Sequence, residues 1–238
     1  MTQLRAEGIV AGYGSVQILH GVSVSAGEGQ VSCIFGPNGC GKSTLLKAIA
    51  GAIDTWKGRV SLDGDDITGL PSHTVLSRGL ALMPQGGGVF AQLSVRDNLR
   101  MGGYTLRSRR ALDERIEELL EEFPRLRERL SVNAGNLSGG EQMMLAIARA
   151  LIVRPRFLLF DEPSAGLSPK LATEALERVA ALAQRGVGVL VVEQNIREAT
   201  RVADRIYILV GGSNRFEGRP ADIADDRELM RMYLGAPE

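Results

Sequence analysis

The stretch Gly36-Pro-Asn-Gly-Cys-Gly-Lys-Ser-Thr44 decides the fold. It fits the pattern G-x-x-x-x-G-K-[ST], with a short apolar run before it and a helical stretch from Lys42 after it. Glycines let backbone N–H groups turn toward an anion, and a helix N-terminus adds partial positive charge. We therefore expect a loop that binds the phosphates of a nucleoside triphosphate, formed by Gly36, Pro37, Asn38, Gly39, Cys40, Gly41, Lys42, Ser43 and Thr44.

Two side chains of this loop have suitable chemistry. Lys42 would bind oxygens of the β- and γ-phosphates, and the Ser43 hydroxyl would bind Mg²⁺. A glycine-rich turn with an incidental lysine is the purely structural alternative. The strand before the loop and the helix after it favour the phosphate site.

A second motif narrows the chemistry to hydrolysis. The apolar run 157–160 ends in two acids, Asp161 and Glu162. At the carboxyl end of a strand, Asp161 suits Mg²⁺ coordination through water, and Glu162 suits a general base or a group that positions water. An acidic turn that caps the strand is the alternative reading. The sequence has no Asn-Lys-x-Asp pattern for reading guanine, which disfavours a GTPase.

Outward from these motifs, short apolar runs alternate with amphipathic stretches. This alternation predicts an α/β fold with a largely parallel sheet. Strands are expected at 30–35, 79–83, 156–160, 188–192 and 205–210, and helices at 42–50, 112–123, 140–151, 170–184 and 195–202.

Two sections depart from this alternation. Runs 4–10, 17–24 and 58–62 are strand-like and joined by glycine-rich turns, which indicates an antiparallel β subdomain. Residues 94–130 are mostly helical in pattern, with Ile116, Leu119, Leu120 and Phe123 on one face. We expect one domain over 1–238, with a helical subdomain at about 90–152 inserted in the α/β core.

The composition excludes several classes of protein. Lys and Arg number 28 and Asp and Glu number 28, so there is no basic excess for coating a nucleic acid. No apolar run reaches the roughly 20 residues that span a bilayer. The first residues lack the pattern of a secretory signal, and Cys33 and Cys40 make no disulfide framework. A reduced cytoplasm is the simplest location.

Leu137-Ser138-Gly139-Gly140-Glu141 lies before the acidic strand and opens a helix. It offers a second phosphate-binding surface, and Ser138 with Glu141 also fits a capping box. At this point the chain resembles the ATP-binding cassette (ABC) ATPases, whose own motif is LSGGE in this order relative to the other two. The resemblance covers nearly the whole chain.

The resemblance assigns roles to further positions. Tyr13 resembles the aromatic residue that stacks on adenine, although a turn tyrosine is an equal alternative. Gln85 resembles the loop glutamine that senses Mg²⁺ and couples to the membrane partner, and residues 164–169 lie where two subunits join. The family usually carries a histidine against the γ-phosphate where this chain has Gln194. An amide cannot become cationic, so hydrolysis is expected to depend less on pH or more on Glu162.

That departure is informative about the subfamily. Val192-Glu-Gln-Asn195 resembles the ATPases of high-affinity branched-chain amino acid importers, as do the runs 66–71, 123–126 and 161–167 and the ending Tyr233-Leu-Gly. Importers of urea or short amides have very similar subunits. The loop Pro84-Gln-Gly-Gly-Gly88 departs from the Pro-Glu-Gly usual in the subfamily.

The resemblance implies a head-to-tail dimer that closes on two ATP molecules with Mg²⁺. Lys42, Ser43 and Asp161 of one subunit would hold ATP, and Ser138, Gly139 and Gly140 of the other would close over it. Permease subunits would dock around 85–101, and a substrate-binding protein would deliver the cargo. The second cassette is expected to be a different chain, and the complex is expected on the inner face of the cell membrane.

Two alternatives to a transport ATPase stay open. A soluble ABC ATPase outside transport usually has two cassettes or long coiled-coil insertions, which this chain lacks. An inactive interaction subunit is disfavoured by Lys42, Asp161 and Glu162. Separately, Lys42 and the helix N-terminus would lower the pKa of the Cys40 thiol and make it reactive, although a small residue that merely fits the loop is the favoured reading.

Overall fold

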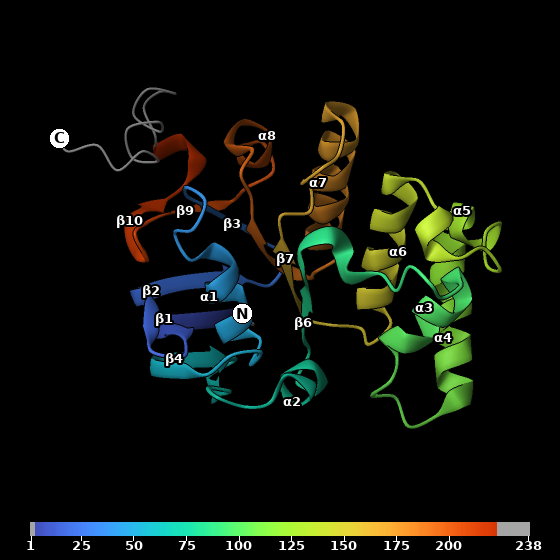
Figure 1. Ribbon diagram of the computed structural model, residues 1–238, viewed down its shortest axis with the longest axis horizontal. Coiled ribbons are helices and arrows are strands. Elements are labelled where there is room, and N and C mark those ends of the chain that lie inside the picture. Colours follow the sequence, from blue (N-terminus) through green and yellow to red (C-terminus); the bar gives the residue numbers. More distant parts are fainter. Residues whose placement is uncertain (1–2, 223–238) are drawn as a thin grey trace.

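The computed structural model describes residues 3–222 and contains two sheets with helices around them (Figure 1). The larger sheet has the strand order β10-β9-β3-β8-β7-β6, and the smaller one β2-β1-β4-β5. The strands are β1 (Gln3–Tyr13), β2 (Val16–Gly27), β3 (Val31–Phe35), β4 (Thr55–Leu62), β5 (Asp65–Asp66), β6 (Leu80–Met83), β7 (Phe157–Asp161), β8 (Gly188–Val192), β9 (Arg205–Val210) and β10 (Ser213–Gly218).

The helices are α1 (Lys42–Ile49), α2 (Ser72–Ser77), α3 (Val95–Gly102), α4 (Arg109–Glu122), α5 (Pro124–Arg127), α6 (Gly139–Leu151), α7 (Pro169–Gln184) and α8 (Ile196–Thr200). Short 3₁₀ turns lie at Gln85–Gly88, Ala134–Asn136 and Pro220–Asp222. Among residues 3–222, no helix combines the length and apolar character that crossing a bilayer requires.

The larger sheet separates two hydrophobic cores. Its strands β9, β3, β8, β7 and β6 pair in parallel, and every residue of β3, β7 and β8 is buried. Strands covered on both faces read as continuous apolar runs, which is why the sequence located them. Cys33 and Phe35 face the core shared with α6 and α7, whereas Ile34 faces the core shared with α1 and the antiparallel sheet. The expected fold class is confirmed.

Helices α3 to α6 lie together at one end of the molecule (Figure 1). The expected apolar face of α4 is buried: Ile116, Leu119, Leu120 and Phe123 are all less than a tenth exposed. The fully buried Asn98 on α3 donates to the carbonyl oxygens of Phe90, Leu93 and Ser94. This side chain therefore shapes the loop that leads into the helical section.

Some elements differ from expectation. Helix α8 is shorter than 195–202, and the chain turns soon after it so that the Asp204 carboxylate accepts from the backbone N–H of Val31. Strand β10 and helix α2 were not expected, because both are short and bury few residues and so show weak apolar periodicity. The Tyr233-Leu-Gly ending lies outside the described residues.

Candidate active site

The phosphate loop connects β3 to α1, as its sequence context predicts. Its glycines have local reasons to be glycine. Gly41 precedes the helix with φ = 101°, and a Cβ atom there would lie 2.7 Å from Leu19 Cδ2. A Cβ atom on Gly36 would lie 2.2 Å from the carbonyl oxygen of Leu209. The loop is thus folded tightly against β2 and β9, and neither of these glycines could carry a side chain without displacing its neighbours.

Lys42 lies inside the curve of this loop and is only 5% exposed. Its ammonium group donates to the carbonyl oxygens of Gly36 at 2.8 Å and Pro37 at 3.2 Å. Carbonyl dipoles hold the ammonium in place but do not neutralise its charge. An anion beside the loop would therefore find a buried positive charge.

Ser43 and Asp161 meet at the carboxyl end of the larger sheet. The Ser43 hydroxyl donates to Asp161 Oδ1 at 2.8 Å. Burial raises the pKa of the Asp161 carboxyl, with the neighbouring Glu162 adding to the rise and the bond from Ser43 opposing it. A hydroxyl and a carboxylate at this spacing fit the oxygen ligands that Mg²⁺ prefers.

Glu162 is the centre of the cluster. Its Oε2 accepts from Gln85 Nε2 at 2.7 Å, and its Oε1 accepts from Gln194 Nε2 at 2.8 Å. Its backbone is in the left-handed region, φ = 53°, and its N–H donates to Val192 O at 2.9 Å. Three loops far apart in the sequence thus converge on one carboxylate.

One cavity brings most of the expected residues together. Tyr13 lies at the edge of this cavity and is 46% exposed, and the Lys47 ammonium is 6.0 Å from the centroid of the Tyr13 ring. The cavity is lined by Tyr13, Ile18, Asn38, Gly39, Gly41, Lys42, Ser43, Thr44, Gln85, Glu162 and Gln194. The ring of Tyr13, the phosphate loop and the Glu162 carboxylate therefore share one opening.

The LSGGE motif lies elsewhere. Ser138 caps α6 and forms the expected capping box: its N–H donates to Glu141 Oε2 at 2.8 Å, and the Glu141 N–H donates to its hydroxyl. Ser138, Gly140 and Glu141 line a separate cavity between α6 and α7. Within this one chain the motif does not reach the phosphate loop.

The structure disfavours a reactive Cys40. The thiol is buried, and burial raises its pKa more than Lys42 and the nearby backbone N–H groups lower it. A thiol that stays protonated is a poor nucleophile. Cys40 therefore fits the favoured reading, a small buried side chain that fits the loop.

Sequence reasoning missed Glu193. It follows the last apolar residue of β8 and is 1% exposed, and its carboxylate accepts from both the N–H and the hydroxyl of Ser164. An acid directly after a fully buried strand was the available signal. Its partner could not be inferred, because Ser164 is 29 residues away in sequence.

Comparisons with known proteins agree with this geometry. A family model described as ABC transporter matches residues 19–165. The high-affinity branched-chain amino acid transport ATP-binding protein BraG of Pseudomonas aeruginosa is 40% identical over 94% of this chain and 95% of its own. The lipopolysaccharide export system ATP-binding protein LptB of Escherichia coli K12 is 35% identical over 99% of this chain and 98% of its own.

A solved structure, the ADP conformation of MJ1267, an ATP-binding cassette of an ABC transporter, superposes with a TM-score of 0.86 at 30% identity and covers 99% of both chains. The family match, the relatives and the shared fold place the phosphate loop, the acidic strand and the LSGGE motif in one known type of molecule. This chain belongs to the ABC transporter family and is an ATP-binding subunit that hydrolyses ATP.

Proposed function

We propose that this chain powers the uptake of branched-chain amino acids as the ATPase of an importer. The observation that carries the catalytic part is the carboxylate of Glu162, held between Gln85 and Gln194 beside the phosphate loop. The 40% identical relative is named for branched-chain amino acid transport, which supports this cargo. The 35% identical relative is named for lipopolysaccharide export, so the cargo needs its own test.

ATP binding follows from the loop. Tyr13 stacks on the adenine, and backbone N–H groups of Asn38 to Thr44 surround the phosphates. The Lys42 ammonium exchanges its two carbonyl partners for oxygens of the β- and γ-phosphates. The exchange stabilises the complex because a phosphate neutralises the buried charge and the carbonyl dipoles do not.

The residues beside the loop fit Mg²⁺. The Ser43 hydroxyl oxygen and Asp161 Oδ1 are 2.8 Å apart. Ser43 and Gln85 both line the nucleotide cavity. Bound there with ATP, Mg²⁺ would supply neutralisation of phosphate charge. Ser43 would coordinate it directly, Asp161 would hold it through water, and the amide oxygen of Gln85 would face it.

Glu162 then acts on the attacking water. Its carboxylate accepts the water's hydrogen bond and orients the oxygen toward the γ-phosphorus. As the new P–O bond forms, Glu162 takes up the proton, the bond between the γ-phosphorus and the bridging oxygen breaks, and ADP leaves with that oxygen. Gln194 donates one amide hydrogen to the Glu162 carboxylate. Its other amide hydrogen is donated to an oxygen of the γ-phosphate and keeps that group in place. The two side chains that donate to the Glu162 carboxylate, Gln85 and Gln194, are neutral amides, so neither changes charge between pH 5 and 8.

A second cassette completes the site. Ser138 and Gly140 line a cavity separate from the phosphate loop, so a head-to-tail partner would bring its own Ser138, Gly139, Gly140 and Glu141 to the γ-phosphate. The helix N-terminus beneath these residues offers free N–H groups to the anion. We propose that the partner in the cell is a different cassette.

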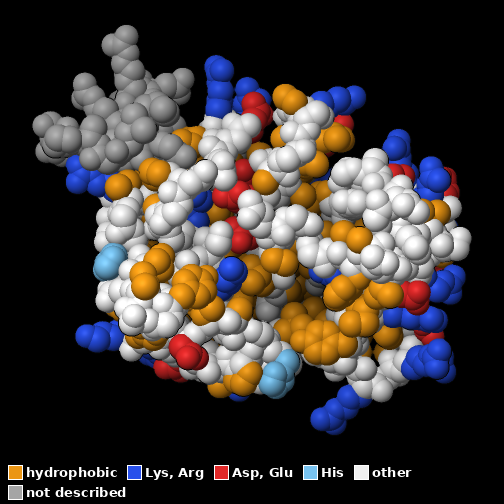
Figure 2. All heavy atoms as spheres, viewed as in Figure 1, with side chains coloured by type: hydrophobic (Ala, Val, Ile, Leu, Met, Phe, Trp, Pro, Cys, Tyr) orange, Lys and Arg blue, Asp and Glu red, His pale blue; other side chains and the backbone are white. Residues whose placement is uncertain are grey.

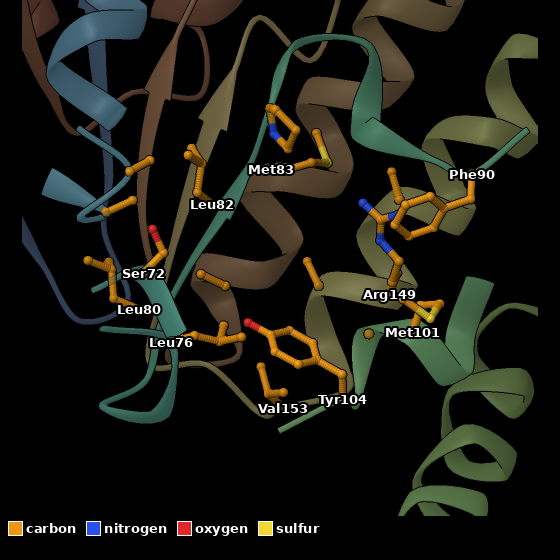
Figure 3. Close-up of a pocket in the computed structure, with 17 residues that line it drawn as sticks. Ser72, Leu76, Leu80, Leu82, Met83, Phe90, Met101, Tyr104, Arg149 and Val153 are labelled. Carbon is orange, nitrogen blue, oxygen red and sulfur yellow. The ribbon is translucent and has the colours of Figure 1, made fainter. Parts of the chain in front are cut away.

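The permease docks on a groove between α2 and the helical section. Figure 2 shows hydrophobic side chains gathered in a hollow of this face, and Figure 3 shows Phe90, Met101, Tyr104 and Arg149 around it. Phe90 and Met101 are each 45% exposed and Tyr104 is 62% exposed, an unusual grouping for a free surface. An apolar helix at the cytoplasmic side of a permease fits this groove, and it would hold the chain at the inner face of the membrane.

The groove is linked to the active site. Arg149 of α6 donates to the carbonyl oxygens of Gly88 at 2.5 Å and Gly87 at 3.2 Å, and its guanidinium lies 5.1 Å from the centroid of the Phe90 ring. Gly87 and Gly88 belong to the turn that carries Gln85. A permease helix that presses on Phe90 would therefore move the turn whose Gln85 side chain donates to the Glu162 carboxylate.

Uptake in proteoliposomes tests the cargo. The chain, its cognate permeases and the binding protein are reconstituted, and ATP-driven accumulation of labelled leucine, urea and a short amide is measured. Leucine accumulation that needs ATP and competes with isoleucine and valine is the expected result. Accumulation of urea or the amide without leucine would contradict the proposed cargo, as would an assembly that extracts lipid outward.

A further inference from the structure

Glu193 is a buried acid whose partners are hydrogen-bond donors of two loops. Its Oε1 accepts from the Ser164 N–H at 2.9 Å, and its Oε2 accepts from the Ser164 hydroxyl at 2.7 Å and the Gln194 N–H at 3.2 Å. Burial raises the pKa of this carboxyl, and these bonds oppose the rise. Burying a carboxylate costs free energy, so three matched donors indicate that the local arrangement depends on it.

The first loop is the turn after β7. Ser164 lies two residues beyond Glu162, and the turn is closed by bonds from the Ala165 N–H to Glu162 O at 3.1 Å and from the Leu167 N–H to Ser164 O at 3.2 Å. Glu162 itself holds φ = 53°, which a non-glycine side chain adopts only when its surroundings keep it there. Glu193 binds this turn by accepting hydrogen bonds from both the backbone N–H and the hydroxyl of Ser164.

The second loop carries Gln194. Its backbone N–H is bound by the Glu193 carboxylate, and its side-chain amide donates to Glu162 Oε1 at 2.8 Å. The contacts form a closed ring that runs from Glu193 to Ser164, along the chain to Glu162, across to Gln194 and back. Glu162 and Gln194 line the nucleotide cavity, and Glu193 lies behind them.

We propose that Glu193 is a positioning residue that fixes the Glu162 carboxylate and the Gln194 amide relative to each other, by tying the turn after β7 to the segment after β8. The inference rests on the proposed function of Glu162 and Gln194. Glu193 does not touch the nucleotide, so its loss misplaces the hydrolytic pair while the phosphate loop still binds ATP.

The test compares three variants of the full-length chain. Glu193→Ala removes every bond, Ser164→Ala removes the hydroxyl bond, and Glu193→Gln keeps the shape but turns an amide NH₂ toward the donors. Steady-state ATP hydrolysis is measured at a protein concentration high enough that adding more protein no longer raises the specific activity. We expect kcat to fall between about 10- and 100-fold in Glu193→Ala and less in Glu193→Gln and Ser164→Ala. KM for ATP should stay within about twofold in all three.

Coupling provides a readout that a merely structural role would not move. In Gln194→Ala, the ring is already open, so adding Glu193→Gln should lower kcat by clearly less than it does in the wild type. Glu177→Gln, on an exposed part of α7, is the matched control and should keep the wild-type kcat. Thermal unfolding of each variant identifies any that does not fold. If Glu193→Ala does not fold, the kcat values of Glu193→Gln and Ser164→Ala decide whether Glu193 is a positioning residue.

Two results would overturn the positioning role. Unchanged kcat in Glu193→Gln and Ser164→Ala would do so, as would a rise in KM with kcat unchanged. Glu162→Gln is measured in the same assay to separate the two proposals. If Glu162→Gln is inactive and the Glu193 variants are normal, only the inference on Glu193 fails; if Glu162→Gln is active, the proposed roles fail with it.

Discussion

Glu162 shows at the scale of one residue how the site is built. Its left-handed backbone costs of order 1 kcal/mol or more, and β7, β8 and the amides of Gln85 and Gln194 keep it in place. Strain of this kind is found where a side chain has to be held at one point. Here that point is between the phosphate loop and two neutral donors.

We expect Gln194 to add no pH dependence to hydrolysis. An amide does not titrate, so the wild-type rate should show no step from this position between about pH 5 and 8. In Gln194→His, the imidazole titrates near 6.5, and its cation adds positive charge beside the γ-phosphate. The rate of the variant relative to the wild type should therefore rise as pH falls through about 6.5. Paired pH–rate profiles of the assembled complex measure this, and superimposable profiles would show that the position does not matter.

Cys40 should be unreactive in the folded protein. Burial raises its pKa, so the thiolate is scarce at neutral pH, and Cys33 is buried as well, with its pKa raised even further. Treatment with iodoacetamide followed by mass measurement should find no label on the native chain and two labels on the unfolded chain. Rapid labelling of native Cys40 that MgATP blocks would contradict the expectation.

At the scale of elements, the helical section depends on the apolar face of α4. Leu119 is 1% exposed, so Leu119→Ala removes buried methyl groups and leaves a cavity. The free energy of unfolding should drop by about 2–5 kcal/mol. The neighbouring Glu121→Ala, on the exposed face, should change it by no more than about 0.5 kcal/mol. Denaturant unfolding measures both, and equal effects would mean that this face does not support the fold.

Elements differ in how far the sequence reveals them. The parallel strands are readable because burial on both faces makes them continuous apolar runs. Helix α4 is readable because three of its apolar residues and Phe123, which follows it, share one face. Strand β10 is not readable from the sequence, because none of its residues is buried. The phosphate loop and the acids were found by local spacing. The bond of Glu193 to Ser164 was not, since it depends on how β7 and β8 pair.

At the scale of the whole molecule, the exposed aromatics of the groove should carry the permease contact. Tyr104→Asp places a charge among apolar side chains, so co-purification with the permeases should fall at least tenfold, a cost of about 1.4 kcal/mol. Val16→Asp changes an equally exposed apolar residue outside the groove lining and should keep the association. Equal retention of permeases by both variants would place the docking surface elsewhere.

The phosphate loop and the start of α6 line separate cavities. In the proposed mechanism, two copies or two related cassettes bring these surfaces together, and closure would exclude water from all but the reacting position. Opening after hydrolysis would return the groove to its first position. Local charges hold the ATP anions, so a net charge of zero is no obstacle.

The Glu162→Gln variant tests the central claim most directly, because it changes one oxygen to an NH₂ and keeps the shape of the side chain. We expect its affinity for MgATP to stay within about threefold of the wild type, its turnover to fall at least about 100-fold, and ATP to trap it as a closed dimer visible by size. ATP hydrolysis by Glu162→Gln at the wild-type rate would contradict the account of this site.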